Sequence, residues 1–572
     1  MTRIALLALL ILTPSISQAN SYRNLFTEFE LENNYGKTVA FKEFQEKPII
    51  VLAFIGTECP LAKLYGPKLK ALDEKYRDRG VVILGISSNT QDSLTELTAY
   101  VHRYEIDFPV LKDLGNRLAD KVQATRTPEV FVFDQQRELR YHGRIDDQYG
   151  VGYSRYDTKN QDLANAIEAL LNGEEVPVPE TKAVGCVIGR VKKHEPNGEI
   201  TFTKHVAPIL NARCVSCHRE GEIGPFTLKS YEDVQGWEET ILEVIEENRM
   251  PPWGANPDYG HFSNDARLSD EEKATLRSWV ANGMPEGDPS DLPEPPKFVD
   301  GWRIPEPDQV VLMREKDKPF QVPAEGVVDY KRFIIDPEWK EDKYIYAAEA
   351  RPQNRAVVHH ILVYIIPPRA RNADLKRVLV GYAPGNVPIH YKDGLALKVP
   401  AGSKLLFEMH YTPNGSPQED LSYAGVCFID KEDVTQEVSG ELVATHRFAI
   451  PPGEANYEVT ASSWIYKDCD LLSMTPHMHL RGKAFRYEAK IPGKDDPVVL
   501  LDVPKYDFNW QLKYILKDPL RLPRGTKIIC KAVFDNSEDN LVNPDPTKRV
   551  FWGDQSWDEM MIGFMTTKPA QE

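Results

Sequence analysis

Histidine and methionine side chains gather in short motifs in the second half of this 572-residue chain. The chain has 13 histidines, and five of them lie in these motifs. Imidazole suits copper in both of its oxidation states, and the soft thioether sulfur of methionine favours the reduced ion. The motifs therefore predict copper redox chemistry. The residues are the adjacent pair His359 and His360, then His410, then His477 and His479 two positions apart, and Met560 in an Asp-Glu-Met sequence.

A second motif has the spacing of a c-type haem attachment site: Cys214, Cys217 and the following His218. The two thiols lie one helical turn apart and can reach both vinyl groups of one haem, while His218 can bind the iron. A haem of high potential takes a thioether as its sixth ligand. Met250 is preferred over Met284 because two prolines hold its loop. A zinc or redox CxxC is the alternative, but it would not need the histidine.

Cys59 follows an apolar run at 48–54 that predicts a buried strand, and it opens a predicted helix. A thiol at a helix N-terminus has a lowered pKa, which favours the reactive thiolate. Thr127 and Pro128 precede a later strand. On these residues the segment 20–178 resembles the redoxin family of thioredoxin-like and peroxiredoxin-like proteins, in which a cis-proline faces the thiol.

The segment departs from that family at the thiol motif. Ala62 stands where a thioredoxin has its second cysteine, so disulfide exchange through a CxxC is excluded. Thr57 lies two positions before Cys59, whereas a peroxiredoxin usually has threonine three before. Two interpretations stay open. Cys59 reduces peroxides with Cys186 as the resolving thiol and Arg126 beside the thiolate, or the fold is retained with an idle or sensing thiol.

The order of the histidine and methionine motifs resembles the copper type II, ascorbate-dependent monooxygenases, which include peptidylglycine α-hydroxylating monooxygenase and dopamine β-monooxygenase. The resemblance implies two sandwiches that face each other across a wet gap, each holding one copper ion. It implies that His359, His360 and His410 bind the electron-supplying copper, and that His477, His479 and Met560 bind the copper that activates O2.

Strand geometry adds two conditions to this ligand set. Adjacent His359 and His360 would point to opposite faces of a regular strand, so binding one metal requires a local bend. His477 and His479 would share one face if both lie in a strand. Met561, next to the ligand Met560, should point away.

Two positions differ from the peptide-amidating members of that family. Phe564 stands four residues after the methionine ligand, where those enzymes have a tyrosine that helps to hold the substrate carboxylate. Thr475 and Pro476 stand where an arginine is expected before the His-x-His pair. Peptidylglycine is therefore not the expected substrate. His390 and His446 fit no motif.

The pattern of apolar runs, turns and linkers predicts a multi-domain protein: an α/β thioredoxin-like domain, an all-α cytochrome c domain that resembles class I cytochromes c, and two all-β, jelly-roll-like sandwiches. The predicted boundaries are a signal peptide at 1–19, the redoxin domain at 20–178, a linker at 179–198, the cytochrome domain at 199–288, a linker at 289–308, and sandwiches at 309–432 and 433–568.

Composition and the N-terminus constrain partners and compartment. The net charge of −17 argues against nucleic acid and anionic membrane surfaces. A charged start, a short apolar run and a small-residue site ending at Ala19 predict a cleaved secretory signal, hence a periplasmic or extracellular protein without stable membrane insertion. Export allows disulfides, and Cys469 with Cys530 is the preferred pair among cysteines that also include Cys427.

Together these features predict an exported copper monooxygenase that hydroxylates a C–H bond with O2. Its cofactors would be two copper ions and one covalently attached haem c, which passes electrons from a small reductant or redox protein. The substrate would be a small molecule or a peptide. The alternatives are a copper and haem electron-transfer or copper-binding protein without hydroxylation, and a thiol peroxidase centred on Cys59.

Overall fold

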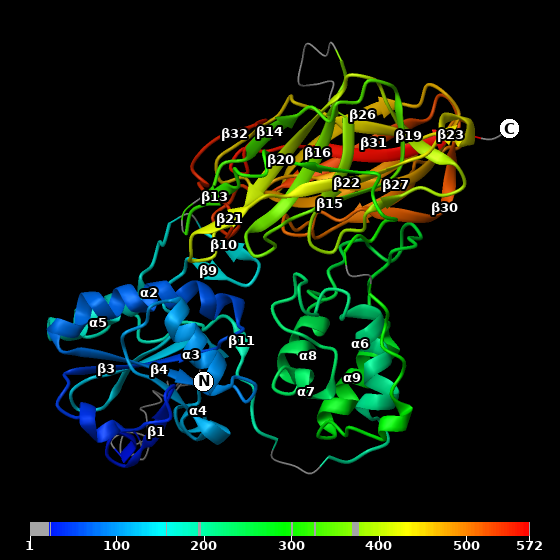
Figure 1. Ribbon diagram of the computed structural model, residues 1–572. Helices are drawn as coiled ribbons and strands as arrows, with labels where there is room; N and C mark the ends of the chain where they lie inside the picture. The colour runs from blue at the N-terminus through cyan, green and yellow to red at the C-terminus, as the bar shows by residue number, and fades with distance from the viewer. Residues whose placement is uncertain are drawn as a thin grey trace, which may run out of the picture. The chain divides into compact units, whose positions relative to one another are not determined.

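The computed structural model describes residues 22–570 except 23, 156, 193–195, 299–300, 325, 327 and 369–376. The expected signal peptide lies outside the described residues. The chain forms two compact units (Figure 1). The first holds residues up to Val151, Thr158–Lys193 and Gln235–Trp237, and the second holds the remainder. Within the part described, no helix has both the length and the apolar character that crossing a bilayer requires.

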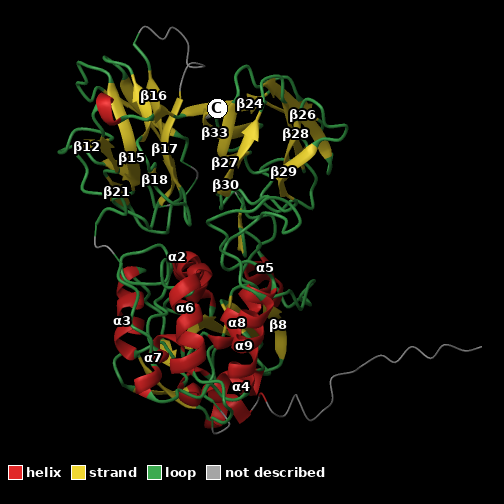
Figure 2. Ribbon diagram, turned by 90° about the vertical axis from the view of Figure 1, so that its right-hand side faces the viewer, coloured by secondary structure: helices red, strands yellow, loops and turns green. Residues whose placement is uncertain are grey.

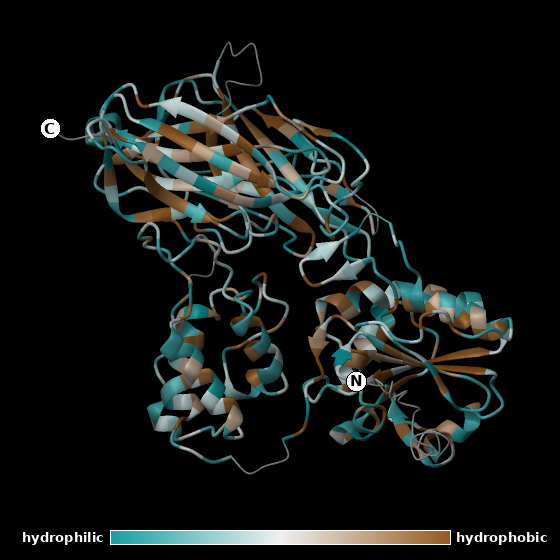
Figure 3. Ribbon diagram, turned by 180° about the vertical axis from the view of Figure 1, so that it is seen from behind, coloured by the Kyte–Doolittle hydropathy of each residue, from teal (hydrophilic) through white to brown (hydrophobic). Residues whose placement is uncertain are grey.

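The first unit is a mixed sheet covered by helices on both faces, as expected of a thioredoxin-like α/β domain. Its strand order is β2-β1-β5-β4-β3-β7-β8, with β3 parallel to β4 and antiparallel to β7. Every residue of β3 is buried, because apolar clusters lie on both sides of the sheet, and its strands are accordingly brown in Figure 3. The strands are β1 (Glu30–Asn33), β2 (Thr38–Ala40), β3 (Ile49–Ile55), β4 (Val81–Ser87), β5 (Val110–Lys112), β6 (Arg126–Thr127), β7 (Glu129–Phe133), β8 (Leu139–Gly143) and β9 (Tyr149–Gly150). The helices are α2 (Pro60–Tyr76), α3 (Leu94–Arg103), α4 (Arg117–Val122) and α5 (Asp162–Leu171), with short 3-10 turns at Phe41–Phe44, Arg77–Arg79 and Leu114–Asn116.

Most of the segment expected as the first linker, 179–198, instead belongs to this unit, which includes residues 179–192. Its strand β11 (Cys186–Val187) pairs antiparallel with β6. Gly185 has a φ of +146°, and a Cβ at this position would lie 2.0 Å from the Thr127 carbonyl oxygen. Only glycine permits so close an approach. The Pro- and Gly-rich composition that suggested a linker therefore marks a tightly packed return to the sheet.

The second unit begins with a helical segment. Its elements are the π-helix Phe202–Val206, α6 (Ala207–Arg213), α7 (Tyr231–Val234), α8 (Glu238–Glu246), α9 (Asp270–Ala281) and the 3-10 turn Pro289–Asp291. Ser269 and Glu272 form a capping box at the start of α9, as their spacing of three residues favours. An apolar cluster that includes Leu210, Leu276 and Trp279 holds these helices together.

The rest of the second unit is all-β, as predicted, and its sheets pack in pairs (Figure 2). In the first pair, the sheet β14-β20-β16-β17 shares an apolar core with the sheet β12-β22-β15-β19-β23. The strands are β12 (Gln309–Leu312), β13 (Phe320–Val322), β14 (Lys331–Ile335), β15 (Lys343–Arg351), β16 (Val358–Ile366), β17 (Arg377–Tyr382), β18 (Ile389–His390), β19 (Leu395–Val399), β20 (Lys404–Tyr411), β21 (Gln418–Asp420), β22 (Tyr423–Phe428) and β23 (Gln436–Glu437). A 3-10 turn at Lys431–Asp433 lies between β22 and β23.

In the second pair, the sheet β24-β33-β27-β30 shares a core with the sheet β26-β31-β28-β29. These strands are almost all antiparallel, so alternate side chains face the core and the outside. The strands are β24 (Ser439–Ala444), β25 (Ala449–Ile450), β26 (Tyr457–Trp464), β27 (Cys469–His477), β28 (Gly482–Lys490), β29 (Val498–Val503), β30 (Tyr514–Leu522), β31 (Lys527–Phe534), β32 (Val550–Phe551) and β33 (Ile562–Pro569). The short strand β10 (Tyr153–Ser154) also belongs to the second unit.

The preferred disulfide, Cys469 with Cys530, is not formed, and both thiols are free. Cys530 packs against Gly563, which pairs with Pro476 on β27. Pro476 is seven residues along that strand from Cys469, which is about 23 Å at roughly 3.3 Å per residue. Membership of one pair of sheets therefore does not bring these two cysteines together.

Candidate functional site

A β-bulge places two adjacent histidines on one side of strand β16. Val358 pairs with Tyr411 and His360 pairs with His410, so the ladder to β20 shifts register across His359. The extra residue in a bulge bends the strand and re-aims its side chain. This is the local bend that the sequence requires if His359 and His360 are to meet one ion.

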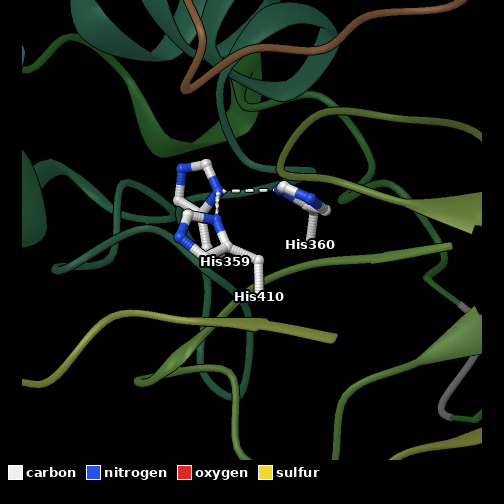
Figure 4. A group of neighbouring side chains, drawn as sticks. All are labelled: His359, His360 and His410. Atoms are coloured by element: carbon white, nitrogen blue, oxygen red, sulfur yellow. Dashed lines mark hydrogen bonds between the residues drawn. The ribbon is translucent and has the colours of Figure 1, made fainter. Parts of the chain in front are cut away.

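The three imidazoles then converge through their Nδ1 atoms (Figure 4). The Nδ1 of His359 lies 3.1 Å from that of His360 and 3.2 Å from that of His410. Nitrogen ligands about 2.0 Å from a tetrahedral metal ion lie about 3.3 Å from one another. The cluster therefore has the spacing of a three-nitrogen metal site.

Burial keeps these imidazoles neutral, which is the form that binds metal. It lowers the pKa of His359 to about 4, although a hydrogen bond to Asn509 opposes the shift. Burial, together with repulsion from the neighbouring imidazoles, lowers the pKa values of His360 and His410 well below the usual range. The Nε2–H of His359 donates to Asn509 Oδ1 at 3.2 Å, so its Nδ1 lone pair faces the cluster.

His477 and His479 form a second pair that presents the opposite ring nitrogen. The Nδ1–H of His477 donates to Gln511 Oε1 at 2.7 Å, and that of His479 donates to the Asp558 carbonyl oxygen at 3.3 Å. With Nδ1 protonated, Nε2 is the atom that each ring would offer to a metal, and the ring centroids lie 5.2 Å apart. The His479 ring also has a hydrogen bond with the Gln555 backbone. Outer hydrogen bonds of this kind fix the tautomer of metal-binding histidines.

Glu559 ties the segment that carries Met560 to this second pair. Its buried carboxylate accepts hydrogen bonds from the backbone N–H groups of His479 at 2.9 Å, Arg481 at 2.6 Å and Met560 at 3.2 Å. Burial raises the pKa of Glu559 to about 8 despite these bonds. Met560 is half-buried, while Met561 points into the core of the second pair of sheets, as expected.

Aromatic rings fill the space between the two histidine groups. Tyr330 stacks on His410 with ring centroids 4.9 Å apart and lies 6.2 Å from the ring of His479. Phe508 lies 5.6 Å from the ring of His359 and 6.1 Å from that of His479. Tyr330 and Phe508 therefore touch both groups, in contrast to the open, wet gap that the family resemblance implies.

Gln511 also joins the two groups. Its Oε1 accepts from His477, and its Nε2 lies 3.4 Å from the Nδ1 of His360. Sequence reasoning missed Gln511, Tyr330 and Phe508, because they are common residue types outside any motif. These three residues lie near the histidines only in the folded chain.

A cavity of about 330 Å³ lies beside the histidines, between the outward faces of sheets β14-β20-β16-β17 and β24-β33-β27-β30. One histidine of each group, His360 and His477, is on its wall. Thr475 and Phe564 line it as well. These are positions at which the sequence departs from the peptide-amidating enzymes.

Cys214, Cys217 and His218 follow helix α6 in a helical turn, in which the His218 N–H donates to the Cys214 carbonyl oxygen at 2.9 Å. The Nδ1 of His218 bonds the Phe226 carbonyl oxygen at 3.2 Å, which leaves Nε2 free to bind iron. A Cβ on Gly224 would lie 2.8 Å from the His218 Cα, so glycine lets this loop pack on the histidine.

The methionines considered as the sixth haem ligand differ in their surroundings. Met284 is buried in the helical core. Met250 is half-buried and follows α8, and three residues later the Trp253 ring packs on Tyr514, with centroids 4.9 Å apart. No described hydrogen bond joins either methionine to His218.

The helical segment also contacts the loop that precedes the first histidines. Glu222, four residues after His218, forms an ion pair with Arg355, four residues before His359. Neither side chain is more than 20% exposed. The Glu222–Arg355 ion pair thus joins the haem-motif segment to the first pair of sheets. The contact between Trp253 and Tyr514 joins it to the second pair.

In the first unit, Cys59 caps helix α2 and is buried, and its Sγ donates to the Thr127 carbonyl oxygen at 2.9 Å. The Thr127–Pro128 bond beside it is cis. Burial raises the pKa of Cys59, but hydrogen bonds from Cys186, Ala62 and Thr127 outweigh it and lower that pKa to about 6. A pKa this low favours the thiolate at neutral pH, and the Sγ–H bond to the Thr127 carbonyl belongs to the protonated thiol.

Cys186 approaches Cys59 through the pairing of β11 with β6. Cys186 lies directly opposite Thr127, the residue that bonds Cys59. Arg126 donates to the Gly185 carbonyl oxygen at 2.8 Å and so holds β11 in place. The sequence separates the two cysteines by more than a hundred residues, and no spacing rule links them.

Comparison with known proteins bears on this first unit. Residues 23–142 match the AhpC/TSA family. Thiol-disulfide oxidoreductase ResA of Halalkalibacterium halodurans is 26% identical over 111 residues, covering 19% of this chain and 61% of the relative. Chloroplastic peroxiredoxin Q of Triticum aestivum is 29% identical over 120 residues, covering 20% of this chain and 54% of the relative.

A solved structure of a hypothetical protein from Sinorhizobium meliloti is 31% identical, covers 28% of this chain and 91% of that chain, and has a TM-score of 0.27. The chain thus spans between half and two thirds of the curated relatives named above. Residues 23–142 form a redoxin domain related to thiol-disulfide oxidoreductases and peroxiredoxins.

The hydrogen bonds at Cys59 predict its reactivity. Alkylation by iodoacetamide should reach half its maximal rate near pH 6. Cys186→Ala removes a donor and should move that midpoint upward, whereas Cys186→Ser keeps a donor and should move it less. Mass spectrometry of the Cys59 peptide gives the rate. An ordinary midpoint of about 8.5 in the parent protein would contradict the hydrogen-bond geometry.

Proposed function

We propose that the second unit is a copper-dependent monooxygenase. The observation that carries the proposal is the convergence of three imidazoles through Nδ1, close to a second histidine pair whose Nδ1 atoms are hydrogen-bonded. Copper held at such sites supplies one-electron redox chemistry and the activation of O2. Overall, a substrate C–H group, O2, two electrons and two protons would give an alcohol and water.

The protein's part in this chemistry is to hold neutral ligands and to exclude water. His359, His360 and His410 would hold one ion, and His477, His479 and Met560 the other. Gln511 and the Asp558 carbonyl keep Nδ1 of the second pair protonated and so direct Nε2 to the metal. Tyr330 and Phe508 keep bulk water from the histidines.

The cavity beside His360 and His477 is the proposed substrate site. Thr475 and Phe564 on its wall replace polar residues that the amidating enzymes use. The proposed substrate is accordingly a molecule other than peptidylglycine.

A covalently attached haem is the proposed electron carrier. Cys214 and Cys217 would bind it, and the free Nε2 of His218 would take the iron, with Met250 as sixth ligand. The Glu222–Arg355 ion pair and the Trp253–Tyr514 ring contact give the haem segment fixed attachment to the parts that carry the histidines. Both haem attachment and this redox role fit an exported protein.

A copper and haem protein without hydroxylation is the alternative within the same site. The cavity favours the oxygenase, because an electron carrier needs no substrate space beside its metal. Oxygen uptake coupled to formation of an alcohol separates the two.

Metal analysis tests the ligand sets. The parent protein should bind two copper ions per chain, and His410→Ala or His479→Ala should each remove one, because two remaining ligands hold copper far more weakly. His390→Ala, which changes a histidine outside both groups, should retain both ions. Copper and protein are measured on the same dialysed sample. Equal copper content in all four proteins would refute the assignment.

Haem attachment has its own test. Expression with a c-type haem maturation system should add the mass of one haem to the intact chain, and the haem should survive denaturing electrophoresis. Cys214→Ala or Cys217→Ala should abolish the two-thioether product, while the matched control Cys427→Ala should leave it intact. A parent chain that never gains haem under these conditions excludes the proposal.

A second candidate function, thiol peroxidase chemistry, is favoured by the approach of Cys186 to the Cys59 partner Thr127. The Cys59 thiolate would attack the peroxide ROOH and, with one proton, give a sulfenic acid and ROH. The Cys186 thiol would then displace water from the sulfenic acid and form a disulfide. An external dithiol would return both electrons.

This candidate predicts a Cys59–Cys186 disulfide after one equivalent of hydrogen peroxide. Peptide mapping should find the disulfide in the parent protein and a sulfenic acid at Cys59 in Cys186→Ala. Cys427→Ala should behave as the parent. Failure of Cys59 to react faster than Cys427 would reject the peroxidase, because a selective thiolate is its one requirement.

A further inference from the structure

Lys513 lines the cavity beside the histidines without a counter-charge. Among the described residues, no carboxylate forms an ion pair with its ammonium group, and burial alone lowers the Lys513 pKa to about 8. An ammonium group removed from water is costly unless an anion or hydrogen bonds compensate. The other charged groups on this wall, Arg377 and Glu441, have opposite signs and attract each other.

The position of Lys513 places it near the second histidine pair. It immediately precedes β30, whose first residue Tyr514 pairs with Met474 on β27. Lys513 therefore lies opposite Thr475 on β27. Thr475 is two residues before His477, a separation of about 7 Å along the strand. Lys513, Thr475 and His477 all line the cavity, so one small molecule can reach the lysine and the histidine together.

Most of the remaining wall is apolar. Leu362, Leu442 and Phe564, on strands β16, β24 and β33, are among its lining residues. A pocket of this kind binds an apolar body and uses a few polar groups to orient it. The unpaired cation is then the group that selects the charge of the ligand.

We propose that this cavity binds an apolar molecule carrying one carboxylate, and that Lys513 holds that carboxylate. The inference depends on the proposed function where it calls the ligand the substrate. Lys513 would hold the acid group, and the apolar part of the molecule would then lie toward His477. A charge-assisted hydrogen bond in a partly desolvated site supplies both affinity and orientation.

Calorimetry on the metal-free full-length protein tests the proposal without any oxygenase activity. Phenylacetate is the probe, and phenylacetamide, of the same shape without charge, is its comparison. Phenylacetate should bind at least about tenfold more tightly than the amide. Lys513→Met should abolish this preference, and Lys513→Arg should preserve part of it. The matched control Lys517→Met changes an exposed lysine on β30, the strand that follows Lys513, and should bind as the parent.

Equal binding of the two probes, undetectable binding of phenylacetate at millimolar concentration, or an undiminished preference in Lys513→Met would each overturn the inference. None of these outcomes concerns copper binding. A wrong ligand assignment at Lys513 can therefore be told apart from a wrong assignment of the copper ligands.

If the variants do not fold, chemical labelling of the parent protein tests whether Lys513 binds the carboxylate. Acetic anhydride at pH 8 reacts with neutral amines, so Lys513 should label faster than exposed lysines such as Lys517. Phenylacetate should slow labelling of Lys513 alone, because the bound carboxylate favours the charged amine. Phenylacetamide should not. Labelling that phenylacetate leaves unchanged contradicts the proposal.

Discussion

The candidate metal site depends on one backbone constraint, the register shift in β16 at His359. A regular strand would send His359 and His360 to opposite faces, one of them into the core that Ile361 and Val363 fill. The bulge avoids this, and the pairing of His360 with His410 supplies the third imidazole from the neighbouring strand. Every other part of the proposed oxygenase chemistry requires this arrangement of nitrogens.

The surrounding hydrogen bonds also determine which ring nitrogen of each histidine is left for a metal. Asn509 takes the Nε2 proton of His359, whereas Gln511 takes the Nδ1 proton of His477. The two groups therefore present different nitrogens, although burial lowers the pKa of every ring. Gln511 contacts a ring in each group, since its Oε1 accepts from His477 and its Nε2 lies 3.4 Å from the Nδ1 of His360.

Parts of this arrangement could be predicted from the sequence, because they depend on local spacing. The apolar run of β3 and the capping residues of α9 follow from strand and helix periodicity. His477 and His479 do not share a strand face, because β27 ends at His477 and His479 follows it. The need for a bend at His359 followed from adjacency alone.

Other parts could not be predicted, because they depend on contacts between distant segments. Tyr330, Phe508 and Gln511 carry no spacing signal, and two-residue strands such as β11 are too short to show alternation. The composition around Cys186 predicted a linker, yet its glycine permits contact with Thr127. Cys469 and Cys530 show the converse error, since membership of one pair of sheets did not imply proximity.

The most direct test of the copper assignment is anomalous diffraction at the copper edge from crystals of the copper-loaded protein. If the copper assignment is right, two peaks are expected. One should lie about 2 Å from the Nδ1 atoms of His359, His360 and His410, and the other at a similar distance from the Nε2 atoms of His477 and His479. Copper found only elsewhere on the chain, or no peak at the three converging Nδ1 atoms, would contradict it.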